Sequence, residues 1–199
     1  MLDKVKELRA KTFLSISDCM KAVEAVTAGD KTYDEAAAIE WLQQNGVLKA
    51  AKFENRDTRA GIIYAYIHHD KSIGVLLKLT CETDFVAKND KFTELAKNLC
   101  MHIVASSPTY ISIDRVDSPT LESWQKDINT SVSPKIPANK REGAIAGMLD
   151  KQYYQQYVLL EQPYVLDTKH RVKDIVKQLS AAFGENISIA SFTKEVVGR

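Results

Sequence analysis

The spacing of apolar side chains changes along the chain and divides it into a helical part and a mixed part. In residues 1–48 apolar side chains recur three or four positions apart, as in Leu2, Val5 and Leu8. This spacing predicts amphipathic helices, and turn residues interrupt it so that we expect three short ones. Three short helices enclose only a small core. We therefore expect this part to pack against something else.

Short polar side chains and glycine predict where these helices begin and end. Ser17 or Asp18 is suited to cap the start of the second helix. The third helix is expected to begin near Asp34, and Asn45-Gly46 predicts its end.

A β-hairpin follows. Residues 62–67 and 73–79 are rich in β-branched and aromatic side chains, and the turn-type residues 69–72 lie between them. Every second residue of the later strand is apolar, so these side chains share one face that helices can cover. Residues 187–192 alternate in the same way and predict a further strand that pairs with the hairpin.

Two strong helical patterns complete the mixed part. Apolar residues keep helical spacing throughout 92–104, which predicts a core-facing helix capped by Asn89 or Asp90. The same spacing in 172–183 predicts a last helix, which Thr168 is expected to cap.

Residues 106–139 carry the weakest pattern and are rich in Ser and Pro. We expect an irregular excursion here, with one short helix that Ser118-Pro119 begins. The whole chain is predicted to be α+β, with a small antiparallel sheet, made of the hairpin and the C-terminal strand, covered by helices. Its expected parts are an N-terminal three-helix domain (1–48), a linker (49–60) and a core domain (61–199).

Composition and charge narrow the possible partners. Among the 199 residues, 27 Lys and Arg face 26 Asp and Glu, a net charge of +1, which argues against a broad cationic face for nucleic acid. No apolar run is long enough to span a bilayer, so we expect no membrane association. The three cysteines are odd in number and form no Cys-x-x-Cys pair, which indicates reduced thiols and a cytoplasmic protein.

Residue types alone support no catalytic or metal site. The glycines form no phosphate-binding loop, so no nucleotide cofactor is expected. His68, His69 and Asp70 are consecutive, and neighbours in a strand point to opposite sides, so no metal is expected there. Cys81 with His102, or Glu82 with Asp84, would give a reactive pair, but neither has an orienting third residue. We therefore expect no enzyme of covalent chemistry.

The connection between the second strand and the long helix carries a carboxylate beside a large aromatic, Asp84-Phe85. Such a connection is expected to be exposed. Phe85 is either a plug that folds back into its own core or an anchor offered to a partner.

Three segments resemble the elongation factor Ts family, the nucleotide-exchange factors of the translation GTPase elongation factor Tu. They are Cys81 to Asn89 (CETDFVAKN), Leu160-Glu161-Gln162-Pro163, and Val5 to Thr12. The resemblance implies a ubiquitin-associated-like N-terminal domain and a short form with a single hairpin module. It further implies a homodimer that gives a 2:2 complex.

The resemblance also implies the site and its action. The turn of Thr83, Asp84, Phe85 and Val86 is expected to enter elongation factor Tu beside its Mg²⁺ site, displace the ion and release GDP, so that Phe85 is an anchor. GTP then resolves the nucleotide-free complex. Secondary contacts are expected from four further residues: Ile16, Met20, Lys21 and Lys52.

Two departures from the family pattern fall in the N-terminal part. Residues 13–15 lack the glycine that the family usually has in this turn, and Met20-Lys21 stands where paired lysines are usual. The competing function classes are a helical module that binds peptides or ubiquitin-like proteins, and a small enzyme that uses Cys81 or Asp84. The first needs only residues 1–50, and the second needs no GTPase.

Overall fold

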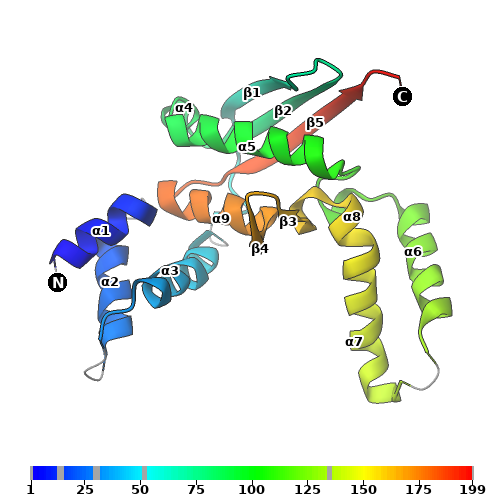
Figure 1. Cartoon of the computed structure of the whole chain (residues 1–199), viewed down its shortest axis with the longest axis horizontal. Helices are drawn as coiled ribbons and strands as arrows, with labels where there is room; N and C mark the ends of the chain where they lie inside the picture. The colour runs from blue at the N-terminus through cyan, green and yellow to red at the C-terminus, as the bar shows by residue number, and fades with distance from the viewer. Residues whose placement is uncertain (1, 13–15, 29–31, 51–52, 134–135, 199) are drawn as a thin grey trace. The chain divides into compact units, whose positions relative to one another are not determined.

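The computed structural model shows an α+β fold (Figure 1). It describes residues 2–12, 16–28, 32–50, 53–133 and 136–198. The chain forms two compact units: the first contains residues 1–62, 80–92 and 174–188, and the second contains residues 63–79, 93–173 and 189–199. The predicted fold class is confirmed, and the predicted domain boundaries stay a prediction.

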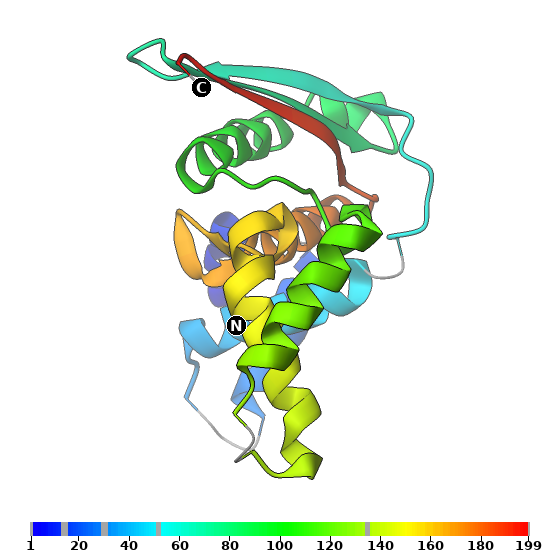
Figure 2. The ribbon, with the colours of Figure 1, turned by 90° about the vertical axis from the view of Figure 1, so that its right-hand side faces the viewer.

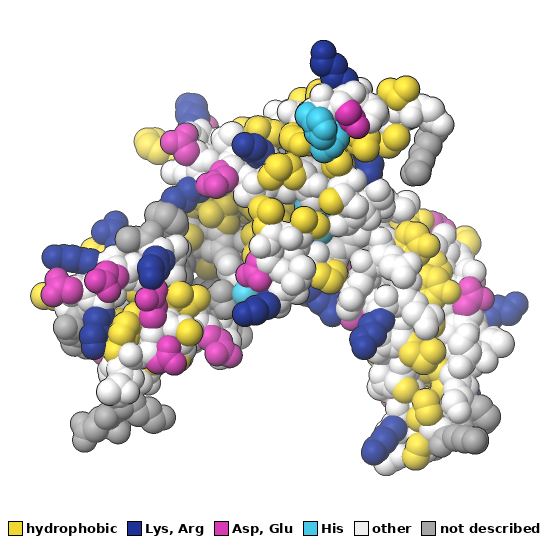
Figure 3. Space-filling model, viewed as in Figure 1, with side chains coloured by type: hydrophobic (Ala, Val, Ile, Leu, Met, Phe, Trp, Pro, Cys, Tyr) yellow, Lys and Arg dark blue, Asp and Glu magenta, His cyan; other side chains and the backbone are white. Residues whose placement is uncertain are grey.

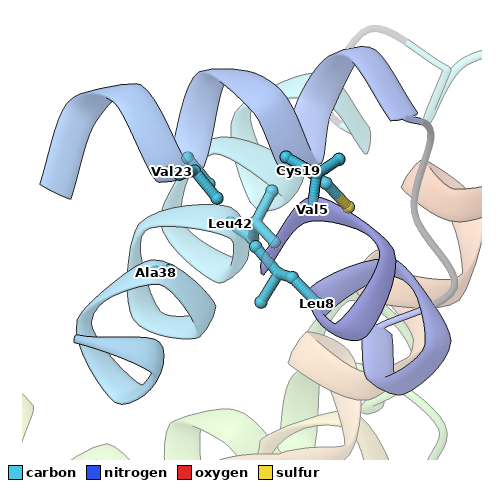
Figure 4. Packing of buried hydrophobic residues seen from close by; sticks show 7 residues of the cluster. Val5, Leu8, Cys19, Val23, Ala38 and Leu42 are labelled. Carbon is cyan, nitrogen blue, oxygen red and sulfur yellow. The ribbon is translucent and has the colours of Figure 1, made fainter. Parts of the chain in front are cut away.

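The N-terminal bundle consists of α1 (Leu2–Thr12), α2 (Ile16–Thr27) and α3 (Glu35–Ala50). Its core is made of small and medium side chains from all three helices: Val5, Leu8, Cys19, Ala22, Val23, Ala38 and Leu42. In Figure 4 the labelled side chains of Val5, Leu8 and Leu42 point toward one another. The expected three helices are confirmed.

Several helix ends in this bundle differ from the prediction. The second helix already begins at Ile16, so Ser17 and Asp18 lie in its first turn instead of capping it. The third helix begins near Asp34 as expected, and Asp34 also caps it, with its Oδ1 accepting from the amide of Ala36 at 2.9 Å. The predicted stop at Asn45-Gly46 is wrong, because α3 continues to Ala50.

A second difference concerns the apolar stripe of the first helix. Val5 and Leu8 are buried, whereas Leu2 at the start of α1 is 69% exposed. The helical spacing is correct, but its first member lies at the helix end, beyond the packed core.

The main sheet contains β1 (Ala60–Ile67), β2 (Ile73–Cys81) and β5 (Ser188–Val196), in the order β1-β2-β5. The predicted hairpin and C-terminal strand are therefore confirmed. Val75, Leu77 and Leu79 of β2 are buried. The long helix α5 (Asp90–Ser106) lies along one face of this sheet (Figures 1 and 2).

The Ser/Pro-rich stretch is more regular than its composition indicated. After the short η1 (Ile113–Arg115), α6 runs over Ser118–Ser131 and α7 over Ala138–Leu149. The two helices lie side by side in Figure 2. Asp117 caps α6 by accepting from the amide of Thr120 at 3.0 Å, so the expected start at Ser118-Pro119 is correct but the cap precedes it.

Aromatic side chains gather around the buried Trp124 of this second helical part. The ring of Trp124 stacks on Tyr153 and Tyr157 at centroid distances of 5.0 and 5.7 Å, and meets Tyr110 edge-on at 6.1 Å. Hydrophobic side chains form a band along α6 and α7 in Figure 3. After α7 the chain continues through short helical turns: η2 (Asp150–Tyr154), α8 (Gln155–Tyr157) and η3 (Leu159–Glu161).

The last helix is preceded by a small hairpin that the sequence did not predict. It pairs β3 (Pro163–Tyr164) with β4 (Asp167–Arg171). Thr168 lies in β4, so the predicted cap is wrong; α9 (Val172–Phe183) begins where the amide of Val172 donates to the carbonyl of Gln162. The residue after α9, Gly184, has φ +71°, a conformation that glycine adopts at helix ends.

One buried histidine ties α5 to the second hairpin. The His102 Nδ1 accepts from the amide of Val165 at 3.2 Å, and its Nε2 lies 2.9 Å from Oε1 of Gln162. Since an accepting Nδ1 carries no hydrogen, the ring is neutral with its proton on Nε2. Burial lowers the pKa of His102, against the opposing effect of the Gln162 bond.

Candidate functional site

The predicted turn folds as a single helical turn, α4 (Asp84–Ala87), between the end of β2 and the start of α5. Thr83 is its N-cap, with the hydroxyl accepting from the amide of Val86 at 3.4 Å. Asn89 then caps α5, because its Oδ1 accepts from the amide of Lys91 at 3.0 Å. Two caps in quick succession keep the turn separate from the helix that follows.

The two side chains of chemical interest both point to solvent. Phe85 is 87% exposed, the largest exposure among the large hydrophobic residues described, while Val86 and Ala87 are buried at 7% and 8%. The plug interpretation of Phe85 is therefore wrong. Val86 was predicted to contact a partner, and its side chain here is buried within the protein.

Asp84 is held by its own turn. Its Oδ2 accepts from Lys88 Nζ at 2.8 Å, an i,i+4 ion pair whose two side chains are 70% and 77% exposed. The hydrogen bond and the charge of Lys88 lower the pKa of Asp84. Asp84 thus stays ionised in mildly acidic solution.

A carboxylate from the far end of the chain binds the start of the turn. Glu185 Oε2 accepts from the amides of Glu82 and Thr83 at 3.2 and 3.0 Å, and its Oε1 accepts from the Thr83 hydroxyl at 2.6 Å. The sequence analysis missed Glu185, which lies 102 positions from Thr83. A signal exists only in retrospect, namely an acidic residue directly after a helix-ending glycine.

Glu82 in turn binds the segment that carries Glu185. Its Oε1 accepts from the amide of Asn186 at 2.6 Å, and its Oε2 lies 3.5 Å from the guanidinium of Arg56. The Asn186 amide group in turn donates to the carbonyls of Glu54 and Arg56, at 3.1 and 2.8 Å. Three segments far apart in sequence are therefore joined beneath the turn.

The candidate nucleophile next to the turn is not activated. Burial, followed by the nearby Glu185 carboxylate, raises the pKa of Cys81 to about 11. Its thiol donates to the carbonyl of Thr83 at 3.1 Å. Because the thiolate is the reactive form, this cysteine is inert near neutral pH.

Three of the four predicted secondary contacts lie on α2. Ile16 and Met20, one helical turn apart, are 50% and 40% exposed, and Lys21 beside them is exposed as well. Lys52 and the glycine-less loop 13–15 lie outside the described residues.

The described part of the chain holds no group of three or more His, Cys, Asp or Glu side chains that could bind a metal ion. No helix among the residues searched is both long and apolar enough to cross a bilayer. On the face drawn in Figure 3, basic and acidic side chains are interspersed.

Almost the whole chain is similar to known proteins of one family. The family model described as "Elongation factor TS" matches residues 3–199. Elongation factor Ts of Oleidesulfovibrio alaskensis is 40% identical over 195 residues, which cover 98% of this chain and 96% of the relative. The protein of the same name from Thermotoga petrophila is 40% identical over 197 residues, or 99% and 96% of the two chains.

Proposed function

The chain belongs to the elongation factor Ts family, and from that premise we propose that it is a guanine-nucleotide exchange factor for elongation factor Tu. Exchange on this GTPase is the general role of the family. The partner is thus the GDP-bound GTPase, and the product is a nucleotide-free complex that GTP resolves.

The proposed action centres on Asp84 and Phe85. The ring of Phe85 enters elongation factor Tu near its Mg²⁺ site, where Asp84 accepts hydrogen bonds from displaced backbone and its charge competes for the surroundings of the ion. Loss of Mg²⁺ then weakens the binding of GDP. The observation that carries this proposal is the 87% exposure of Phe85 on a capped and hydrogen-bonded turn.

Differential binding is sufficient for this function, without covalent chemistry. A factor that binds the empty GTPase more tightly than the loaded one weakens nucleotide binding by the same ratio. Each factor of ten corresponds to about 1.4 kcal/mol, and burial of one Phe ring contributes roughly 1.5–3 kcal/mol. Phe85 therefore accounts for one or two powers of ten, and the exposed face of α2 with Ile16, Met20 and Lys21 supplies part of the remainder.

We extend the proposal to assembly and location. The sheet face that carries Ile63, Ile67 and Leu76 exposes these side chains by 68%, 63% and 50%. An apolar face of this kind supports a homodimer, and hence a 2:2 complex with the GTPase. The three cysteines are buried and form no disulfide bond, which supports a protein that functions in the reducing cytoplasm.

The decisive experiment measures release of a fluorescent GDP from elongation factor Tu, with this protein at catalytic amounts. We expect saturable acceleration, and a loss of about ten- to a hundredfold in Phe85→Ala, since one buried ring contributes one or two powers of ten. Leu166→Ala, which removes an exposed apolar side chain between β3 and β4, is the control. Unchanged exchange in folded Phe85→Ala would refute the insertion mechanism.

Absence of acceleration by the folded wild-type protein would refute the exchange function itself. The helical binding module would then be the better explanation, and its activity should be carried by the N-terminal bundle without Phe85.

A further inference from the structure

The turn that presents Phe85 is bound by a side chain that belongs neither to it nor to its neighbouring elements. Glu185 follows Gly184 at the end of α9, and both of its carboxylate oxygens face the start of α4. Together they accept two amide protons and one hydroxyl proton from Glu82 and Thr83. A single acceptor group thus satisfies three donors at the point where β2 ends.

Glu82 and Thr83 precede the first residue of α4, so their amides take no part in its hydrogen-bond ladder. Amides at the start of a helix need an external acceptor. A negative charge in this place is also favourable with respect to the helix dipole, although α4 is only one turn long. The structure places Glu185 where it both satisfies the amides and fixes the direction in which the turn leaves the strand.

The hydroxyl of Thr83 both donates and accepts a hydrogen bond. It donates to Glu185 and accepts from the amide of Val86, the residue after Phe85. The chain of contacts from Glu185 therefore passes through Thr83 into the backbone of α4. Reciprocal binding of Glu82 to the amide of Asn186 prevents the two segments from sliding past each other.

We infer that Glu185 is a positioning residue for exchange, which holds the Asp84-Phe85 turn in the orientation that the partner requires. This inference rests on the proposed function and deepens it, because Glu185 acts through the turn and not by contact with nucleotide or metal. Without the carboxylate the turn keeps its sequence and its exposed ring, but the amides of Glu82 and Thr83 lose their acceptor and the ring loses its fixed direction.

The test uses Glu185→Gln, which keeps the volume and replaces one acceptor oxygen by a donor that faces other donors. We expect the second-order rate constant of GDP release to fall about tenfold, because displacement of a positioned group by an ångström costs up to about a hundredfold. Glu122→Gln, a charge-matched change at an exposed residue of α6, should leave the rate unchanged. Amide hydrogen exchange of the free protein should show faster exchange at Glu82 and Thr83 in Glu185→Gln alone.

A double-mutant cycle separates positioning from general stability. In a Phe85→Ala background, Glu185→Gln should cause a smaller loss than in the wild type, because the part of its effect that acts through the ring is already absent. Two losses that multiply would overturn the inference, as would a Glu185→Gln rate equal to that of Glu122→Gln. In either of these cases an active wild type and an inactive Phe85→Ala would leave the proposed function standing, whereas an inactive wild type would overturn both.

Discussion

Two phenylalanines on neighbouring turns of the chain have opposite environments. Phe85, in the first turn of α4, is 87% exposed, whereas Phe92, in the first turn of α5, is completely buried. Both follow a capping side chain, Thr83 in one case and Asn89 in the other. Residue type and local structure are therefore alike, and the difference lies in the direction that each helical turn gives its ring.

The comparison shows that exposure of Phe85 is not a consequence of poor order around it. Its neighbours Val86 and Ala87 are buried, and the donors preceding it are bound to Glu185. Leaving a Phe ring in water forgoes roughly 1.5–3 kcal/mol of burial free energy. A hydrogen-bonded turn that keeps such a ring outside is typical of a binding anchor.

The largest expected effect is on stability. Phe92→Ala should lower the free energy of unfolding by about 3–5 kcal/mol, as expected for loss of a buried ring. Phe85→Ala should change it by no more than about 0.5 kcal/mol, because its ring contacts mainly solvent. Urea denaturation of both variants measures the contrast, and equal losses would mean that Phe85 packs within its own protein.

The next effect concerns the charge beside the exposed ring. Asp84→Asn keeps the shape of the turn but removes the carboxylate, so exchange should slow about tenfold, in line with the greater strength of hydrogen bonds to charged acceptors. Stopped-flow release of fluorescent GDP measures this. Asp57→Asn, at an exposed residue before β1, is the matched control, and an equal rate for both variants would remove Asp84 from the mechanism.

Lowering the pH should reduce the stability of the buried region around α5 before it affects the exposed turn that carries Phe85. His102 lies on α5, the helix that carries Phe92, and burial lowers the pKa of His102. A lowered pKa means that the unfolded chain binds a proton more readily, so stability is fully present above the unfolded pKa of about 6.5 and falls as the pH drops below it. Thermal unfolding between pH 7.5 and 5, compared with His102→Gln, measures this contribution.

The melting temperature of His102→Gln should depend less on pH than that of the wild type, although the variant is less stable at neutral pH. A shift of 1 kcal/mol corresponds to roughly 2–4 °C in the melting temperature of a chain of this size. An identical pH dependence in both proteins would mean that other groups cause it.

The smallest effect is expected at Lys88. An exposed ion pair contributes little to stability, so Lys88→Ala should leave the melting temperature unchanged within error and exchange at neutral pH nearly so. Because Lys88 lowers the pKa of Asp84, its removal should move the acid limb of the exchange-rate profile to higher pH. A profile that coincides with that of the wild type would show that the ion pair does not control the charge of Asp84.

The sequence predicted the helices and strands that depend on the pattern of apolar residues within each segment. The hairpin, the C-terminal strand and α5 follow from alternation and helical spacing, and Asn89 caps α5 as one of the two candidates. Asn45-Gly46 misled because the Asn45 side chain donates to the Trp41 carbonyl at 2.8 Å within the helix, and one glycine costs a helix only about 1 kcal/mol.

The features that the sequence did not predict depend on contacts that the spacing of residues along the chain does not reveal. Thr168 has the chemistry of a cap, but pairing of β4 with β3 places it in a strand. In 106–139 the sequence predicted one short helix but not the stacking of Trp124 on Tyr153 and Tyr157, which joins α6 to residues that follow α7. The exposure of Phe85 could be inferred only from the family resemblance, and Glu185 from neither source.

The network beneath the turn has a consequence for protein engineering. A peptide copied from residues 82–88 would retain the aromatic ring and the carboxylate but none of the groups that fix their orientation. A transplant into another scaffold must supply an acceptor in the place of Glu185 and backbone carbonyls in the place of those of Glu54 and Arg56. The portable unit is thus a discontinuous, three-segment epitope, and a short linear inhibitor of the GTPase needs cyclisation or a designed brace to imitate it.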